Sequence, residues 1–273
     1  MIRKFYRKVK EGLGLGGYFD IELATLTRKR QYDHPNQFVR YGKQCFSQSD
    51  EDGLTLEIIK RIGIDDGIFA EFGVGNGTEN NTLCLLSLNW KGFWSGAEDI
   101  AFDVSKTKRL FFYKKFINQE NICSLMDRGM SELVVDDIDL ISVDLDGNDL
   151  YFCEELLKNG FKPSVFIVEY NAKFPPPIKF CIDYNPSHCW NGTDYFGASL
   201  QSFYNMFEKY DYSLICCNAA TGANAFFVKN IYLDLFPETP DNIEDIYVDC
   251  QYYLVTQYGH NQSVKTIELI IRE

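Results

Sequence analysis

The chain has 273 residues, with 27 Lys and Arg against 39 Asp and Glu, so its formal net charge is −12. Apolar residues make up 45% and aromatic residues 15% of the sequence, which excludes intrinsic disorder for most of the chain and suits one large domain. Such an acidic chain is a poor candidate for binding nucleic acid, because phosphates are bound by clustered Lys and Arg.

The start of the chain has the opposite charge to the rest. Residues 1–30 hold eight basic and three acidic residues, a net +5, which leaves −17 for the remainder. Apolar residues recur at helical spacing among the basic ones, which predicts a basic amphipathic helix over residues 1–13. Such a helix can make peripheral contact with an anionic membrane surface, or it can dock on protein. Glycines at 12–17 predict a linker, so we divide the chain into a helix and linker at 1–44 and a domain at 45–273.

From about Gln48 onward, helical and strand patterns alternate. Helices are predicted over residues 52–62, 80–88, 105–112, 149–158 and 200–209. Strands are predicted over residues 68–72, 93–98, 113–117, 140–144, 165–169, 212–217 and 225–228. This alternation indicates an α/β fold, with a Rossmann-like, doubly wound, mostly parallel sheet. A short turn separates the last two strands, which predicts a terminal antiparallel hairpin.

The strongest local signal is the segment Glu71-Phe72-Gly73-Val74-Gly75-Asn76-Gly77, which follows one predicted strand and precedes a predicted helix. Glycines at this position let backbone approach a ligand at the carboxyl edge of an α/β sheet. A dinucleotide fingerprint would place a third glycine where Thr78 stands, so the pattern favours S-adenosylmethionine over NAD. A tight turn without any ligand remains the alternative.

Four motifs together resemble one family. They are Ser47-Gln48-x-x-Glu51-Asp52-Gly53, Phe69-Ala70-Glu71-Phe72-Gly73-Val74-Gly75-Asn76-Gly77 with Asn81-Thr82, Trp90-Lys91-Gly92-Phe93-Trp94, and Ile141-Ser142-Val143-Asp144-Leu145-Asp146-Gly147-Asn148-Asp149. Over residues 45–230 the chain is similar to the FkbM-type methyltransferases, class I S-adenosylmethionine enzymes that often O-methylate sugars.

The resemblance implies a set of cofactor contacts. Glycines of the turn and Glu71 would line the methionine moiety, Glu98 or Asp99 would hold the ribose, and Asn121 would lie near the adenine. The full implied set is Gln48, Glu71, Gly73, Gly75, Asn76, Gly77, Asn81, Glu98, Asn121 and Asp144.

Acidic and amide side chains follow the fourth and fifth predicted strands. Asp144 ends one strand, while Glu169 and Asn171 end the next, so all three should lie at one sheet edge. Oxygen ligands of this kind suit Mg²⁺ or another divalent cation. The arrangement is similar to that of metal-dependent O-methyltransferases, although Tyr170 separates the acid from the amide. The alternative is that these side chains cap a helix and pair with basic neighbours.

A sugar hydroxyl needs a proton acceptor before it can attack a methyl group. The candidate bases are Asp146, His188 and Asp194. His188 and Asp194 lie in a long loop at residues 171–199 that is rich in aromatic residues. Long loops of compact domains are commonly functional, and exposed aromatic rings stack on sugars. The alternative is that these rings fill a small subdomain.

The nine cysteines form no CxxC motif and several lie in apolar runs, which indicates reduced core cysteines rather than disulfides or a zinc site. No apolar segment typical of a signal peptide follows the basic start. We therefore expect a cytoplasmic protein whose residues 1–13 can contact the inner face of the membrane.

The sequence thus predicts an S-adenosylmethionine-dependent O-methyltransferase, with or without a divalent metal. Its partner would be a carbohydrate acceptor that is free, nucleotide-linked or lipid-linked. Two alternatives stay open. One is an NAD-linked sugar oxidoreductase or epimerase, and the other is a non-catalytic domain that binds a glycan or a partner protein.

Overall fold

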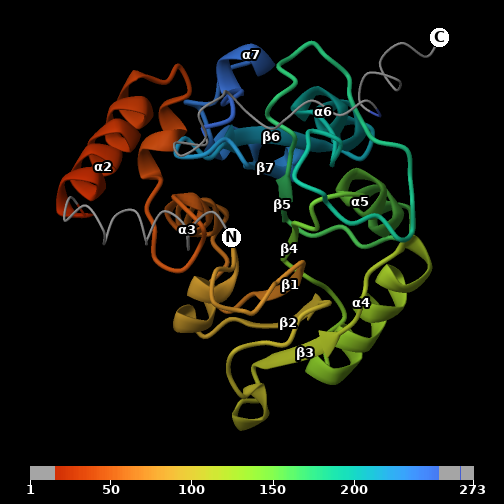
Figure 1. Ribbon diagram of the computed structural model, residues 1–273. Coiled ribbons are helices and arrows are strands. Elements are labelled where there is room, and N and C mark those ends of the chain that lie inside the picture. Colours follow the sequence, from red (N-terminus) through yellow and green to blue (C-terminus); the bar gives the residue numbers. More distant parts are fainter. Residues whose placement is uncertain (1–15, 252–264, 266–273) are drawn as a thin grey trace.

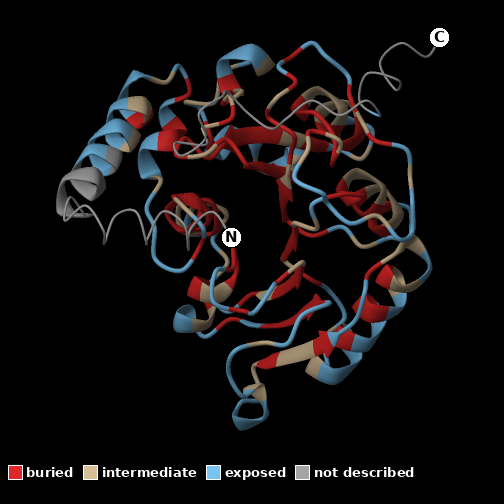
Figure 2. Ribbon diagram, viewed as in Figure 1, coloured by how far each residue is buried: buried red, intermediate tan, exposed pale blue. Residues whose placement is uncertain are grey.

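The computed structural model describes residues 16–251 and residue 265. The amphipathic helix predicted over residues 1–13 lies outside this part of the chain. The first described helix, α2 (Gly16–Asp33), begins inside the stretch predicted as a linker and is followed by the short η1 (Gln37–Tyr41). Much of α2 is exposed, in contrast to the strands (Figure 2). Among the described residues, no helix combines the length and apolar character needed to cross a membrane.

A seven-stranded sheet forms the centre of the domain (Figure 1). Its strands are β1 (Ile68–Phe72), β2 (Lys91–Gly96), β3 (Leu110–Lys114), β4 (Leu140–Val143), β5 (Val165–Glu169), β6 (Tyr212–Cys217) and β7 (Asn224–Lys229). They are ordered β3-β2-β1-β4-β5-β7-β6, and β7 runs antiparallel to both neighbours. The predicted α/β fold, mostly parallel with a terminal antiparallel hairpin, is confirmed.

Helices cover both faces of the sheet. They are α3 (Glu51–Ile62), α4 (Gln119–Leu133), α5 (Asp149–Lys158), α6 (Leu200–Glu208) and α7 (Ile243–Ile246), with short η2 (Leu83–Leu88), η3 (Val104–Lys106) and η4 (Asn230–Leu235). Side chains of a strand alternate between faces. On β1, Phe69 packs in the core with Leu54 of α3, whereas Phe72 packs in the other core with Phe152 of α5. Burial on both faces explains why the strands are continuously apolar.

Two predicted helices are wrong. Residues 105–112 do not form one helix, because Leu110 begins β3 and Phe111 pairs with Phe93 of β2. A short aromatic run fits either structure, and pairing with a neighbouring strand decides between them. Residues 80–88 contain only the 3₁₀ turn η2.

Helix α4 is absent from the sequence-based prediction. Its sequence includes Gly129, which lowers helix propensity. A side chain at that position would lie 2.1 Å from the ring of Phe93, so this glycine is required by the contact between helix and sheet. Tertiary packing therefore overrides the local preference.

Candidate active site

The ends of β1 and β4 touch at the carboxyl edge of the sheet. The backbone nitrogen of Asp144 donates to the carbonyl of Phe72 at 3.0 Å. Gly73 has φ +98°, and a Cβ there would lie 1.6 Å from the Asp144 carbonyl oxygen. Only glycine fits a position with this conformation and this close approach.

The rest of the turn after β1 is open on one side. Gly75 has φ +50° with no atom within 4 Å of where its Cβ would be, whereas Gly77 has φ +79° and packs near Trp94. The side-chain oxygen of the exposed Asn76 accepts from Thr78, and its carbonyl accepts from the Ala101 nitrogen at 2.8 Å. The turn therefore leaves space at Gly75 where a ligand could approach backbone.

Glu71 supports this turn from inside the protein. One carboxylate oxygen accepts from the Asn81 nitrogen at 2.9 Å, and the other accepts from the nitrogen and hydroxyl of Thr82. The Asn81 amide donates to the Ser142 hydroxyl at 3.2 Å. Burial raises the pKa of Glu71 above its ordinary value. These contacts give Glu71 and Asn81 structural roles, and their predicted contacts with a cofactor stay predictions.

The segment around Gln48 is also held by buried acids. One oxygen of Asp52 accepts from the nitrogens of residues 45, 46 and 47. Glu51, wholly buried, accepts from the amides of Asn218 at 2.9 Å and Asn224 at 3.3 Å, which fixes the segment to the β6–β7 hairpin. Gln48 itself is exposed on this loop. Glu51 and Asp52, from the first of the four motifs of the family resemblance, therefore support the sheet edge.

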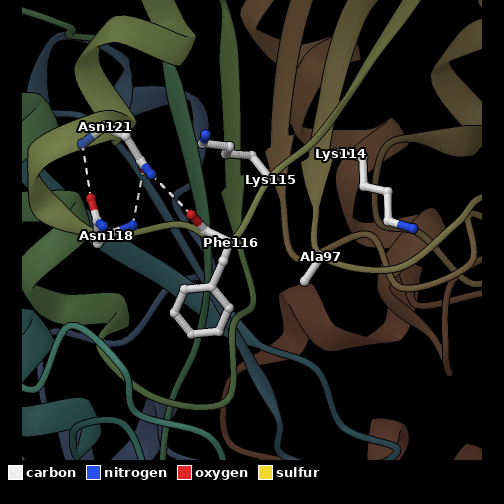
Figure 3. A pocket seen from close by; sticks show the side chains of 6 residues that line it. All are labelled: Ala97, Lys114, Lys115, Phe116, Asn118 and Asn121. Atoms are coloured by element: carbon white, nitrogen blue, oxygen red, sulfur yellow. Dashed lines mark hydrogen bonds between the residues drawn. The ribbon is translucent and has the colours of Figure 1, made fainter.

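An open hollow of about 490 Å³ lies at the carboxyl ends of β2 and β3 (Figure 3). Its lining consists of Ala97, Lys114, Lys115, Phe116, Asn118 and Asn121. Asp99 forms an ion pair with Lys114 at 2.7 Å, whereas Glu98, beside Ala97, is exposed. Phe116 is 45% exposed and offers a ring face to a flat ligand. The two lysines and the phenylalanine were not singled out from the sequence.

Asn121 lines this hollow, but its side chain also caps α4. Its oxygen accepts from the Asn118 nitrogen at 3.0 Å, and its amide donates to the Phe116 carbonyl at 2.9 Å. Asn118 accepts in return from the Asn121 nitrogen, which completes a capping box. The pair therefore shapes the wall of the hollow, and the predicted location of Asn121 beside an adenine remains a prediction.

Three carboxylates come together where β4 and β5 end. Asp144, Asp146 and Glu169 each offer an oxygen within 4.8 Å of the other two. Burial, and then the neighbouring carboxylates, raise the pKa of Asp144 and Glu169 well above their ordinary values. The Glu169 Oε2 atom is buried and accepts no hydrogen bond from any described residue. Such a cluster fits a cation, which would offset the repulsion among the charged oxygens.

Cation size gives a further test of the fit. Oxygens on opposite sides of an ion lie at most two bond lengths apart, about 4.2 Å for Mg²⁺ and about 5 Å for Ca²⁺. The three oxygens all lie within 4.8 Å of one another, which is close enough for one divalent cation to contact all of them. Asp144, Asp146 and Glu169 are therefore the residues that could hold a divalent cation.

Asp149, which had no role in the sequence-based prediction, shapes the loop that carries this cluster. It is fully buried, and its two oxygens accept from the nitrogens of Leu145 at 2.7 Å and Gly147 at 2.8 Å. Asp146, between them, has φ +52°. Burial raises the pKa of Asp149 to about 6, and the charge of Asp146 adds to this shift. The only sign of this role in the sequence is the run Asp146-Gly147-Asn148-Asp149 directly after the predicted strand.

Two other predicted residues, Asn171 and Asp194, have partners in and around the loop at residues 171–199. The amide of Asn171 donates to the carbonyls of Asp194 and Phe196, and its oxygen accepts from the Lys173 nitrogen at 3.2 Å. The carboxylate of Asp194, which is buried, forms an ion pair with Lys173 at 2.7 Å. Asp146 therefore joins Asp144 and Glu169 in the acidic cluster, and a metal contact by Asn171 stays a prediction.

His188 lies against the loop at residues 144–149, which follows β4 and is called the acidic loop below. A Cβ on Gly147 would be 2.6 Å from the Cδ2 atom of His188, so the ring packs directly on that glycine. Its Nε2 atom is buried and has no hydrogen-bond partner among the residues that the structure describes. Burial lowers the pKa of His188, and a hydrogen bond with the backbone of Asp146 partly opposes this. The ring therefore favours the neutral form, which can accept a proton.

The loop at residues 171–199 contains buried aromatic rings, as expected of a small subdomain, and also an exposed ring of the kind that could stack on a sugar. Phe174 and Phe180 stack with ring centroids 4.0 Å apart and form a small core with Ile182. Trp190 remains 37% exposed. Part of the loop is therefore a small subdomain, and part of it offers an aromatic surface.

The strand order, with an antiparallel seventh strand inserted between the fifth and sixth, is that of the class I S-adenosylmethionine-dependent methyltransferases. No protein-family model matches the chain, and no curated protein sequence matches it. The FkbM resemblance therefore stays an expectation from motifs.

Several solved structures are similar at low sequence identity. A proposed hemolysin from Streptococcus thermophilus is 12% identical with a TM-score of 0.43, covering 75% of this chain and 74% of that chain. An O-methyltransferase family 2 protein from Planctomyces limnophilus, in complex with apigenin, is 12% identical with a TM-score of 0.36, covering 76% and 61%. Fibrillarin, in complex with Nop5p, is 10% identical with a TM-score of 0.38, covering 61% and 73%. These scores are low, so the fold class rests on strand order and direction.

Proposed function

We propose that this protein is an S-adenosylmethionine-dependent O-methyltransferase that acts on a sugar hydroxyl with help from a divalent cation. The observation that carries the proposal is the meeting of Asp144, Asp146 and Glu169 at the sheet edge that also holds the glycine turn and the hollow. The acceptor sugar would be free, nucleotide-linked or lipid-linked.

The cofactor would extend along the carboxyl edge from the hollow to the turn at Gly75. Glu98 would accept hydrogen bonds from ribose hydroxyls, and the ring of Phe116 would contact the adenine. When bound, S-adenosylmethionine supplies a methyl group on an electron-poor sulfur. The antiparallel β7 supports this assignment over the NAD-linked alternative, because a dinucleotide-binding sheet continues with a parallel strand.

The acidic cluster would hold the cation and orient the acceptor. Asp144, Asp146 and Glu169 would supply the oxygens, and a bound ion would give the buried Glu169 Oε2 atom the partner that it lacks among the described residues. When bound, a divalent cation lowers the pKa of a coordinated hydroxyl. His188, neutral and beside the cluster, would accept the proton of that hydroxyl. Asp194 is a weaker candidate base because it already pairs with Lys173.

Cofactor binding is tested by isothermal titration with S-adenosylhomocysteine. We expect saturable binding, weakened about tenfold or more in Glu98→Gln because a charged acceptor is lost. Asp136→Asn, an exposed acid that does not line the hollow, is the matched control and should change affinity less than about threefold. No binding to wild-type protein at millimolar ligand would refute the methyltransferase assignment.

The metal is tested separately with Mn²⁺, by loss of the free-ion electron paramagnetic resonance signal. Wild-type protein should bind Mn²⁺, and a double variant with Asp144→Asn and Glu169→Gln should not. Asp136→Asn, an exposed acid outside the cluster, is the control. Equal binding by the double variant would refute the cation site. The acceptor class is tested with tritium-labelled cofactor and a panel of saccharides, and no methylated sugar would refute that part.

A further inference from the structure

The side chain of Asn148 stands at the N-cap of α5 but does not cap this helix. An N-cap asparagine ordinarily accepts a hydrogen bond from the second or third nitrogen of its helix. Here the amide donates to the Asn185 carbonyl at 2.8 Å, and the oxygen accepts from the Asn185 nitrogen at 3.3 Å. Asn148 is buried, so both polar atoms are committed to the loop at 171–199. The usual stabilisation of the helix end has been replaced by a contact with this loop.

Asn185 begins the turn that carries His188. The His188 nitrogen donates to the same Asn185 carbonyl at 2.9 Å. The side-chain oxygen of Asn185 accepts from the nitrogen and hydroxyl of Ser187, which makes the turn compact. A shift of Asn185 would therefore move the imidazole ring as well.

The imidazole ring of His188 packs at a defined position on the loop that follows β4, residues 144–149. Gly147, immediately before Asn148, leaves room for the His188 ring, because any Cβ there would collide with its Cδ2 atom at 2.6 Å. One short stretch, Gly147-Asn148, thus supplies both the surface on which the ring lies and the hydrogen bonds that hold its turn. These two observations are independent of each other.

The chain before this turn is docked as well. The Tyr151 hydroxyl of α5 donates to the Ile182 carbonyl at 2.8 Å, and the Tyr184 hydroxyl accepts from the Gln119 nitrogen at 3.0 Å. Gln119 begins α4, next to the hollow. The loop is therefore held at Ile182, Tyr184 and Asn185, and the contact of Asn148 with Asn185 is the closest of the three to His188 along the chain.

The geometry points to Asn148 as a positioning residue that sets the imidazole of His188 against the acidic loop for proton transfer. This inference rests on the proposed function for its chemical meaning, but its geometry can be tested without activity. Asn148 itself acts through Asn185 and need not touch a substrate.

The test is carbethoxylation of histidine by diethyl pyrocarbonate, followed at His188 by mass spectrometry in the full chain. Asn148→Ala removes both hydrogen bonds, so we expect labelling of His188 to rise about tenfold, as for a loss of about 1–2 kcal/mol. His34, half-buried elsewhere, serves as an internal reference and should not change. Asn159→Ala, which removes an asparagine at the other end of α5, is the matched control.

A second variant guards against general unfolding. Gly147→Ala should displace the ring from the opposite side and also raise labelling at His188, while a cooperative urea-unfolding transition shows that the domain is folded. Labelling of His188 in folded Asn148→Ala within twofold of wild type would overturn the inference.

Catalysis gives the complementary measurement once a saccharide acceptor is identified. Asn148→Ala should lower kcat with little change in KM for the acceptor. Adding Asn148→Ala to His188→Gln should cause no further loss, because the group that Asn148 positions is already gone. Losses that multiply in the double variant would assign Asn148 a general structural role and overturn the inference. A failure to find any acceptor bears on the proposed function only, and the labelling result still decides the positioning role.

Discussion

Asp149 should make the protein less stable as the pH rises from about 4 to 7. Its pKa is raised from an ordinary value of 3.8 to about 6, chiefly by burial, so the folded chain holds this proton at a higher pH than the unfolded chain does. The associated stabilisation is complete below pH 3.8 and is lost as the pH rises through 6. A difference of about two pKa units corresponds to about 3 kcal/mol.

The effect is measured as the difference in unfolding free energy between wild type and Asp149→Asn. Urea unfolding in EDTA can be followed through the fluorescence of the fully buried Trp90 and Trp94. Asparagine does not titrate, so the stability of wild type relative to the variant should fall by about 2.5 kcal/mol between pH 4 and pH 7, because at pH 4 the carboxyl of the unfolded chain is already partly ionised. Asp136→Asn, compared in the same way, controls for the loss of an exposed acid. A difference that stays constant or grows with pH would refute the argument that burial holds the proton on Asp149.

Three further substitutions test the supports of the sheet edge, each by urea unfolding. Gly73→Ala should cost more than about 4 kcal/mol or prevent folding, because the new Cβ would meet the Asp144 carbonyl, and soluble protein of near wild-type stability would contradict this. Gly75→Ala should cost only about 1–2 kcal/mol, for its positive φ in open space, and a loss as large as at Gly73 would be unexpected. Asn118→Ala should cost about 1 kcal/mol and increase amide exchange in the first turn of α4, and unchanged exchange would show that the capping box contributes nothing.

The sequence determined most of the strands, although β3 (Leu110–Lys114) begins three residues before the predicted strand at 113–117. Buried strands such as β1 and β5 were predicted with their observed bounds, because a continuous apolar run that ends in a polar or glycine-rich turn has few alternatives. The parallel pairing of β4 and β5 then places their carboxyl ends at one edge, so Asp144 and Glu169 could be expected to lie together.

Only the tertiary structure decided which polar side chains face the open site and which support it. Asp146 and Asn171 are both polar residues near strand ends, yet the backbone conformation of the loop directs Asp146 to the carboxylates while Asn171 is held by the 194–196 segment. Tertiary contact also explains Gly129 of α4, because any side chain there would collide with the ring of Phe93 on β2. Such roles depend on contacts between residues far apart in the chain, which local pattern and composition do not specify.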